Sequence, residues 1–266
     1  MNHGADAEDA MKIVVVGGTG KIGARVVNNL RQQGHEAVPA APNTGVNTIT
    51  GEGLAEVLRG ASVVVDVTDS PAWGDAEVLK FFETSTRNQL TAEAAAGVGH
   101  HVALSVVGTD RLLESGYFRG KMAQEKLIRE SGRPYTIIHA AQFFEFLGKL
   151  ADISAADGVI RLSHVRFQPM AADDVGLAVA RIALGPPANG IVEVAGPEPF
   201  WLDALVQRRL AAAGDPRRVM ADPEPRYSGA KLKETTLLPG KDARLGGIRF
   251  ETWLAQSTPE AQAPAA

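Results

Sequence analysis

The stretch IVVVGGTGKIG, residues 13–23, decides the fold. A short apolar run ends there in four glycines, and the spacing Gly18-x-Gly20-x-x-Gly23 is typical of a tight turn between a strand and a helix that binds a dinucleotide. The first N–H groups of such a helix have no partner within the helix, and its positive dipole end favours a pyrophosphate. The dinucleotide site is predicted to include Gly17, Gly18, Thr19, Gly20, Lys21, Ile22 and Gly23.

Strand-like runs alternate with helix-length segments over the first half of the chain. Strands are predicted at 12–16, 36–40, 62–67, 101–107 and 135–139. Helices are predicted at 21–33, 52–59, 75–96 and 117–131. Several of the strand runs are nearly continuous in Val, Leu and Ile, which is typical of parallel strands buried on both faces. The pattern predicts an α/β fold with a Rossmann-type doubly wound parallel sheet.

After about residue 142 the pieces become shorter and less regular. A helix is predicted over 173–184, a strand over 190–196 and a helix opening near Trp201, while three prolines and two glycines in 214–229 indicate a loop region. The predicted organisation is a Rossmann core followed by a small C-terminal substrate lobe with returning core elements. Its parts are a disordered extension at 1–10, a dinucleotide-binding core at 11–142, the lobe at 143–256 and a disordered tail at 257–266.

The composition limits the classes of function. The 266 residues are 45% hydrophobic and 22% charged, as in globular proteins, and a net charge of −4 argues against nucleic-acid binding. The acidic start of the chain lacks a signal peptide and no apolar run is long enough to span a bilayer, so we expect no membrane partner and a cytoplasmic location. There is no cysteine, and the adjacent His100 and His101 would face opposite sides of a strand, so no metal site is predicted.

The end of the second predicted strand bears on the choice of cofactor. NAD-binding proteins usually carry an Asp or Glu there for the ribose hydroxyls, but residues 40–48, AAPNTGVNT, contain no carboxylate. Asn43 and Thr44 are neutral donors able to hold a 2′-phosphate, and Lys21 could add charge. These features favour NADP(H) over NAD(H), although an ordinary turn at these residues would suit either cofactor.

Tyr117 and Lys121 lie four residues apart on a predicted helix and therefore share one face. A nearby ammonium lowers the pKa of a tyrosine from its usual ~10, which would let Tyr117 give its proton to a carbonyl oxygen. Ser105, at the end of the preceding strand, could donate to the same oxygen, and Lys121 could reach the nicotinamide ribose. A packed or strand-capping serine and a solvated lysine are the alternatives.

With these residues in place, the chain resembles the short-chain dehydrogenase/reductase superfamily, and more narrowly its atypical, NmrA-like branch. The motifs GGTGKIG, TRNQLTAEAAAGVGHHVALS, RPYTIIHAAQFFEF and MAADDVGLAVA carry the resemblance, which covers about residues 11–200. It implies a Rossmann fold, a bound nicotinamide dinucleotide, Thr68 along the cofactor trough and Ser105, Tyr117 and Lys121 in the catalytic positions. Many members of this branch lack the tyrosine, and some are redox-sensing regulators that bind the cofactor without turnover. The presence of all three residues, Ser105, Tyr117 and Lys121, favours an enzyme.

Three phenylalanines in QFFEF, residues 142–146, follow the strand predicted at 135–139. They belong either to the core or to the substrate pocket, and we expect Phe143 and Phe144 to contact an apolar substrate. The sequence thus predicts an NAD(P)H-dependent reductase of a small carbonyl or quinone. The alternatives are a regulatory protein that senses the cofactor without turnover and an isomerase or epimerase that retains its cofactor; a homodimer and a monomer both fit.

Overall fold

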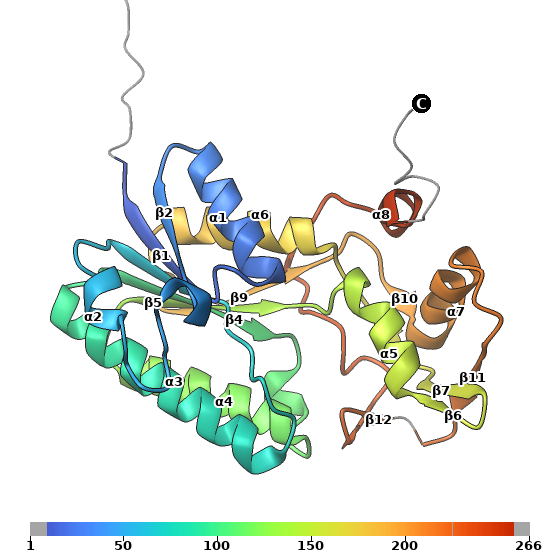
Figure 1. Ribbon diagram of the computed structural model, residues 1–266. Coiled ribbons are helices and arrows are strands. Elements are labelled where there is room, and N and C mark those ends of the chain that lie inside the picture. The colour runs from blue at the N-terminus through green and yellow to red at the C-terminus, as the bar shows by residue number, and fades with distance from the viewer. Residues whose placement is uncertain (1–9, 225, 258–266) are drawn as a thin grey trace, which may run out of the picture.

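The computed structural model describes residues 10–224 and 226–257 (Figure 1). Its centre is a seven-stranded sheet in the order β14-β9-β5-β4-β3-β1-β2, in which every neighbouring pair is parallel. This confirms the predicted α/β, Rossmann-type doubly wound sheet. The strands are β1 (Lys12–Val16), β2 (Glu36–Ala40), β3 (Val63–Asp66), β4 (His100–Val106), β5 (Tyr135–Ala140), β9 (Gly190–Ala195) and β14 (Arg244–Leu245).

Helices cover both faces of this sheet, as Figure 1 shows. On one face lie α1 (Lys21–Gln32) and α6 (Ala172–Leu184), and on the other lie α2 (Leu54–Val57), α3 (Asp75–Ala96) and α4 (Gly116–Glu130). Successive side chains of a strand point to opposite faces. In β1, Ile13 packs with the α1 and α6 side and Val14 with the α2 side. Because helices cover both faces of the sheet, every residue of β1 from Ile13 to Val16 is apolar.

The remaining elements form a smaller region beside the carboxyl edge of the sheet (Figure 1). Its helices are α5 (Leu147–Ile153), α7 (Leu202–Ala212) and α8 (Phe250–Ser257). Its short strands are β6 (Ala155–Ala156), β7 (Val159–Ser163), β8 (Arg166–Phe167), β10 (Phe200–Trp201), β11 (Arg218–Asp222), β12 (Arg226–Tyr227) and β13 (Ala230–Lys231). Residues 143–256 also supply α6, β9 and β14 to the central sheet and its helices. The division of the chain into a core and a substrate lobe at residue 142 stays a prediction.

The loop predicted over 214–229 is wrong in part, because β11 lies within it and pairs in parallel with β7. Pro216 and Pro223 flank this strand without interrupting it, so their missing N–H groups do not break its hydrogen bonds. The ends predicted as disordered, 1–10 and 257–266, fall outside the described residues except for Ala10 and Ser257, the last residue of α8.

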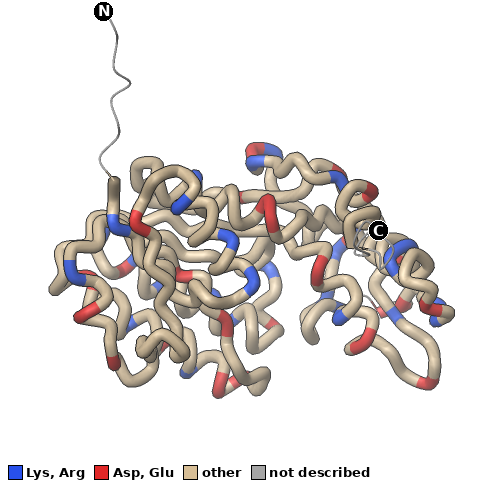
Figure 2. The backbone as a smooth tube through the Cα atoms, turned by 45° about the horizontal axis from the view of Figure 1, so that its top comes forward, with Lys and Arg blue, Asp and Glu red and all other residues tan. Residues whose placement is uncertain are grey.

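Charged residues of both signs are interspersed along the chain, as the alternating blue and red segments of Figure 2 show. Within the described ranges, no helix combines the length and the apolar character needed to cross a membrane. The same part of the chain contains no cluster of three or more His, Asp or Glu side chains able to hold a metal ion.

Candidate active site

The glycine loop, residues 17–23, joins β1 to α1 and makes two kinds of close approach. A Cβ atom on Gly23 would lie 2.1 Å from the Gly17 carbonyl oxygen, and one on Gly18 would lie 2.6 Å from the Val15 oxygen. Gly17 itself has a φ of +79°, which side chains rarely adopt. Gly20 differs, since a Cβ there would meet only the Gly17 oxygen at 3.2 Å. Gly17, Gly18 and Gly23 thus allow the turn to pack tightly. Gly20 leaves the outer side of the glycine loop open.

The start of α1 offers free backbone donors at this open side. The helix has no side-chain cap at Gly20, and among the described residues no backbone carbonyl accepts from the N–H groups of Thr19, Lys21, Ile22 or Gly23. Unpaired N–H groups at a helix start, with the positive end of the helix dipole, attract an anion. The loop therefore fits the pyrophosphate of a dinucleotide in charge, donors and space.

The residues after β2 lie beside this loop. The Thr19 hydroxyl donates to Oδ1 of Asn43 over 3.1 Å, which places an exposed amide next to the glycines. The Thr44 hydroxyl is engaged in its own turn, accepting from the Ala41 N–H and donating to the Ala41 carbonyl, each over 2.9 Å. Thr68, after β3, donates its hydroxyl to the buried Asp66 carboxylate over 2.7 Å. Of these three predicted cofactor contacts, Asn43 is the one whose side chain adjoins the glycine loop.

A cavity of about 640 Å³ lies where the glycine-loop helix, the ends of β4 and β5 and the smaller region meet. Six of the residues singled out in the sequence line it: Lys21, Ile22, Ser105, Tyr117, Phe143 and Phe146. The ammonium of Lys149, on α5, lies 4.6 Å from the ring centroid of Trp73, in the loop after β3, and both residues line the cavity. A contact between the two parts of the molecule therefore borders the cavity.

The structure does not bring every predicted site residue to this cavity. Phe144 is buried in the hydrophobic core, where its ring packs 5.4 Å from Phe250 and 5.3 Å from Trp253. Lys121 is also absent from the cavity lining. The glycines, Thr19, Asn43, Thr44 and Thr68 do not line it either.

Tyr117 is partly buried, with its ring packed among Trp73, Phe82 and Phe118. Burial raises its pKa well above the usual value, and the charge of Asp69, with hydrogen bonding to that carboxylate, raises it further. The sequence predicted the opposite direction for the pKa, from a neighbouring Lys121. The difference arises first from the burial of the phenol, and second from Asp69, a carboxylate that also lines the cavity.

Lys121 lies beneath the cavity in the buried layer between the sheet and α4. Its ammonium donates to the Leu104 carbonyl over 2.8 Å and to Oε1 of Gln124 over 2.6 Å, and lies 4.5 Å from the centroid of the Phe82 ring. Burial lowers the pKa of Lys121, while the charges of Asp66, Asp69 and Glu125 oppose that shift. Two of its three N–H donors are thus held within the protein interior.

Ser105 reaches the cavity from the end of β4, and its hydroxyl is bonded from behind. It donates over 2.6 Å to the carboxylate of Glu125, which is 1% exposed and also pairs with His139 Nε2 at 2.8 Å and with Arg129. Burial alone would raise the pKa of Glu125, but hydrogen bonds from His139 and Ser105 and the charge of Arg129 hold it below its ordinary value. Glu125 is therefore ionised at neutral pH, and Ser105 presents a hydrogen-bond acceptor to the cavity.

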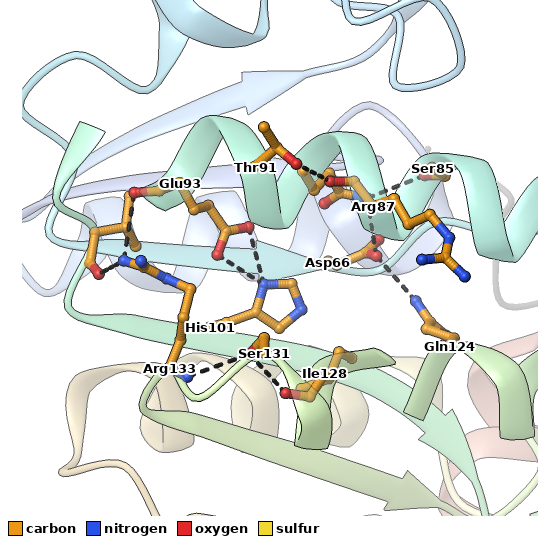
Figure 3. A network of polar contacts seen from close by, with 12 residues as sticks. Asp66, Ser85, Arg87, Thr91, Glu93, His101, Gln124, Ile128, Ser131 and Arg133 are labelled. Atoms are coloured by element: carbon orange, nitrogen blue, oxygen red, sulfur yellow. Dashed lines mark hydrogen bonds and ion pairs between the residues drawn. The ribbon is translucent and has the colours of Figure 1, made fainter. Parts of the chain in front are cut away.

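Asp66, at the end of β3, accepts hydrogen bonds from several polar side chains of this buried layer (Figure 3). Besides Thr68 it accepts from Gln89 over 3.1 Å and from Gln124 over 2.9 Å, and Figure 3 shows Gln124 pointing toward it. Farther along α3, Glu93 binds the His101 ring over 2.9 Å in the same view. These contacts tie β3 and β4 to the two helices that carry Tyr117 and its neighbours.

The sequence analysis missed three groups that shape the site, namely Asp69, Glu125 and Gln142. Glu125 carried a usable signal, because it lies one helical turn beyond Lys121 on the same face as Tyr117. Asp69 and Gln142 lie in loops that follow strands, where the spacing of residues gives no side-chain direction.

Known proteins match this chain in sequence and in fold. Residues 17–146 match a family model described as NAD(P)H-binding. A photosystem II assembly factor, Ycf39, from Cyanophora paradoxa is 25% identical over 151 residues, which are 52% of this chain and 47% of that protein. The chain spans about half the length of the curated relatives it matches.

Three solved structures with less than a fifth of their residues identical share the fold. UDP-glucose 4-epimerase from Thermotoga maritima is 16% identical with a TM-score of 0.71, covering 92% of this chain and 96% of that one. A short-chain dehydrogenase/reductase superfamily protein from Agrobacterium tumefaciens with bound NAD is 18% identical with a TM-score of 0.67, covering 94% and 95%. An NADPH-dependent quinone oxidoreductase from Escherichia coli is 18% identical with a TM-score of 0.59, covering 80% and 78%.

The family match covers the glycine loop, β3, β4 and the helix that carries Tyr117, and the solved structures extend the likeness in fold over most of the chain. Residues 17–146 therefore carry the match to the NAD(P)H-binding family, and over most of its length the chain shares the Rossmann-type fold of these solved structures.

Proposed function

We propose that this protein is an NAD(P)H-dependent reductase of a small carbonyl or quinone compound, with NADP(H) preferred over NAD(H). One observation carries the proposal: the cavity of about 640 Å³ is lined both by Ile22 of the glycine-loop helix and by Tyr117 and Ser105. A substrate in this cavity lies beside the end of the dinucleotide site. The quinone oxidoreductase with the same fold supports this reaction class.

The glycine loop and its neighbours would hold the cofactor. The free N–H groups of Thr19, Lys21, Ile22 and Gly23 bind the pyrophosphate, and Asn43 lies where the adenosine ribose extends. The lack of a carboxylate in residues 40–48 supports a 2′-phosphate. A bound nicotinamide would supply the hydride for the carbonyl carbon.

Tyr117 is the proton donor in this proposal. Because its pKa is raised, the phenol stays protonated at neutral pH. It gives its proton to the carbonyl oxygen as that oxygen gains the charge of an alkoxide, a stronger base than a phenolate. Ser105, as an acceptor, then binds the new hydroxyl group, and Lys121 positions α4 from beneath through Leu104 and Gln124. Phe143 and Phe146 give the cavity an apolar wall that excludes water.

The test is a single-turnover measurement of protein-bound NADPH across ketones, aldehydes and quinones. We expect the wild-type protein to oxidise NADPH with at least one of these compounds, and Tyr117→Phe to do so about a hundredfold more slowly. Tyr135→Phe, which alters a tyrosine outside the cavity lining, serves as the matched control. An unchanged rate in Tyr117→Phe overturns the role of Tyr117, and no oxidation by any compound in the wild type overturns the reductase.

A second candidate is a protein that binds NAD(P)H without turnover and passes its redox state to a protein partner. The contacts of the two hydroxyls favour it, because Ser105 and Tyr117 each face a carboxylate, Glu125 and Asp69. The curated relatives are named as assembly factors, which is compatible with a partner protein. Tight NADPH binding without oxidation, and a different partner or oligomeric state with NADP⁺ than with NADPH, would identify this function.

A further inference from the structure

Gln142 follows β5 at the junction of the sheet with the smaller region and lines the cavity. The residue is 7% exposed, and within the described part of the chain neither Nε2 nor Oε1 of its amide completes a hydrogen bond. Buried amides are normally paired, because an unpaired polar atom in the interior has lost its hydrogen bonds to water without gaining others. A wholly unpaired amide in a cavity wall therefore indicates a ligand that pairs with it.

The other polar groups around Gln142 have their donors directed elsewhere. Ser105 donates to Glu125, and Tyr117 faces Asp69. Burial raises the pKa of Tyr227, and the neighbouring Gln142 amide opposes that rise, although the two side chains do not complete a hydrogen bond in this structure. Gln142 thus supplies a donor and an acceptor side by side, neither with a completed hydrogen bond, in the wall of the cavity that Tyr117 and Tyr227 also line.

We propose that Gln142 determines substrate specificity by pairing with an amide-type group, in which a carbonyl acceptor adjoins an N–H donor. This inference rests on the proposed reductase and names its substrate class: a carbonyl compound that carries a lactam or similar amide next to the reducible carbon. A primary amide and a cis amide are complementary, donor to acceptor at both ends, so one such group satisfies both atoms of Gln142. The apolar cavity wall suits a flat ring around that group.

The position of Gln142 favours the substrate as the source of this amide. Its neighbour Tyr227 comes from the smaller region, on β12, and Tyr227, Tyr117 and Gln142 all line the same cavity. A substrate whose carbonyl carbon is held at Tyr117 therefore shares this cavity with the Gln142 amide. The nicotinamide carboxamide of the cofactor has the same chemistry, and the experiment separates the two sources.

Isatin and N-methylisatin are the probes, because both carry a reducible ketone beside a lactam carbonyl and only isatin carries the N–H donor. Their affinities are measured by calorimetry with NADP⁺-loaded protein, which cannot turn over. We expect wild-type protein to bind isatin about tenfold more tightly than N-methylisatin, because methylation removes the N–H donor and leaves the Gln142 carbonyl oxygen unpaired. In Gln142→Leu the preference disappears, while NADPH affinity and the thermal midpoint are maintained or raised.

Gln168→Leu is the matched control, because the Gln168 amide donates to the Gly196 carbonyl over 2.8 Å and does not line the cavity. It keeps the preference for isatin. Gln142→Glu, which retains the side-chain shape and loses the N–H donor, must weaken isatin binding even if the leucine variant fails to fold.

Equal binding of the two probes by wild-type protein overturns the proposal, as does a preference that survives in Gln142→Leu. A tenfold loss of NADPH affinity in that variant also overturns it, by assigning the amide to the nicotinamide. A Gln142-dependent preference for isatin without any oxidation of bound NADPH supports the amide site and overturns the reductase, so the two failures are distinguishable.

Discussion

The Ser105 hydroxyl donates a 2.6 Å hydrogen bond to the buried carboxylate of Glu125, which links the end of β4 to α4 behind the cavity wall. The same carboxylate oxygen pairs with His139 on β5, so Glu125 fixes two strand ends at once. The serine expected to donate to a substrate oxygen is therefore held as an acceptor, and in the proposed reductase Tyr117 is the group that would donate the proton.

Glu125→Gln is expected to lower the free energy of unfolding by about 3 kcal/mol at neutral pH, because it removes a buried charge that His139 and Arg129 pair with. The folded pKa of Glu125 lies below its ordinary 4.5, so its contribution is complete above that value and is lost as pH falls through the folded pKa. Denaturation by urea at several pH values measures both effects. The difference between the two proteins must shrink below about pH 4.5; a difference independent of pH contradicts this assignment.

Asp69→Asn is expected to bring the pKa of Tyr117 down toward its usual value, because the neutral amide removes the repulsion that opposes the phenolate. The measurement is the ultraviolet absorbance of tyrosinate during an alkaline titration, with Tyr117→Phe to identify the signal. Asp242→Asn, at an exposed aspartate, controls for the loss of one negative charge. If the tyrosinate signal of Tyr117 appears at the same pH with and without Asp69, then Asp69 does not hold this hydroxyl.

Regular elements of the core were predictable because the same residues that favour a strand or helix locally also provide the apolar surface that the fold buries. The strand of residues 12–16 and the helix of 75–96 have the predicted bounds, since the first is apolar on both faces and the second is bounded by Gly74 and Gly97. β11 was not predicted because it pairs with β7, a short strand more than 50 residues earlier in the chain. No local sequence pattern indicates such a pairing. Its prolines only mark the strand ends.

The candidate site was predictable in its positions and less so in its contacts. Helix periodicity puts Tyr117 and Lys121 on one face of α4, but does not reveal that Lys121 turns inward to the Leu104 carbonyl. Phe143 and Phe144 are neighbours in sequence, and only the fold decides that the first lines the cavity and the second fills the core. Such choices depend on which surface each side chain meets, a property of the packed molecule.

Gly20→Ala and Gly23→Ala are expected to separate cofactor binding from folding. A methyl group at Gly20 meets only one protein atom at 3.2 Å but occupies the side of the loop open to the pyrophosphate, so NADPH binds at least about tenfold more weakly in a folded protein. At Gly23 the methyl group would lie 2.1 Å from the Gly17 oxygen, so the fold itself loses stability. NADPH fluorescence and thermal unfolding measure the two effects.

Gly148→Ala is the control for these variants, because a Cβ at this position on α5 meets no atom within 4 Å. It should leave NADPH affinity unchanged and stabilise the helix slightly. Weakened NADPH binding in Gly148→Ala, or unchanged binding in Gly20→Ala, contradicts the placement of the pyrophosphate at the loop.

Asn43→Asp is expected to reverse the cofactor preference. Asn43 accepts from the Thr19 hydroxyl next to the glycine loop, and an aspartate can keep this hydrogen bond, so the fold is maintained. The added carboxylate repels a 2′-phosphate and accepts from the free ribose hydroxyls of NADH, which together shift the ratio of NADPH to NADH affinity by about tenfold or more. Dissociation constants for both cofactors at low and high salt measure this shift, which must diminish with salt because screening weakens the repulsion. Asn47→Asp, whose Oδ1 accepts from the Ile49 N–H in its own turn, adds the same charge four residues away and should leave the ratio nearly unchanged. An equal shift in both variants would mean that net charge, and not the position beside the glycine loop, controls the choice of cofactor.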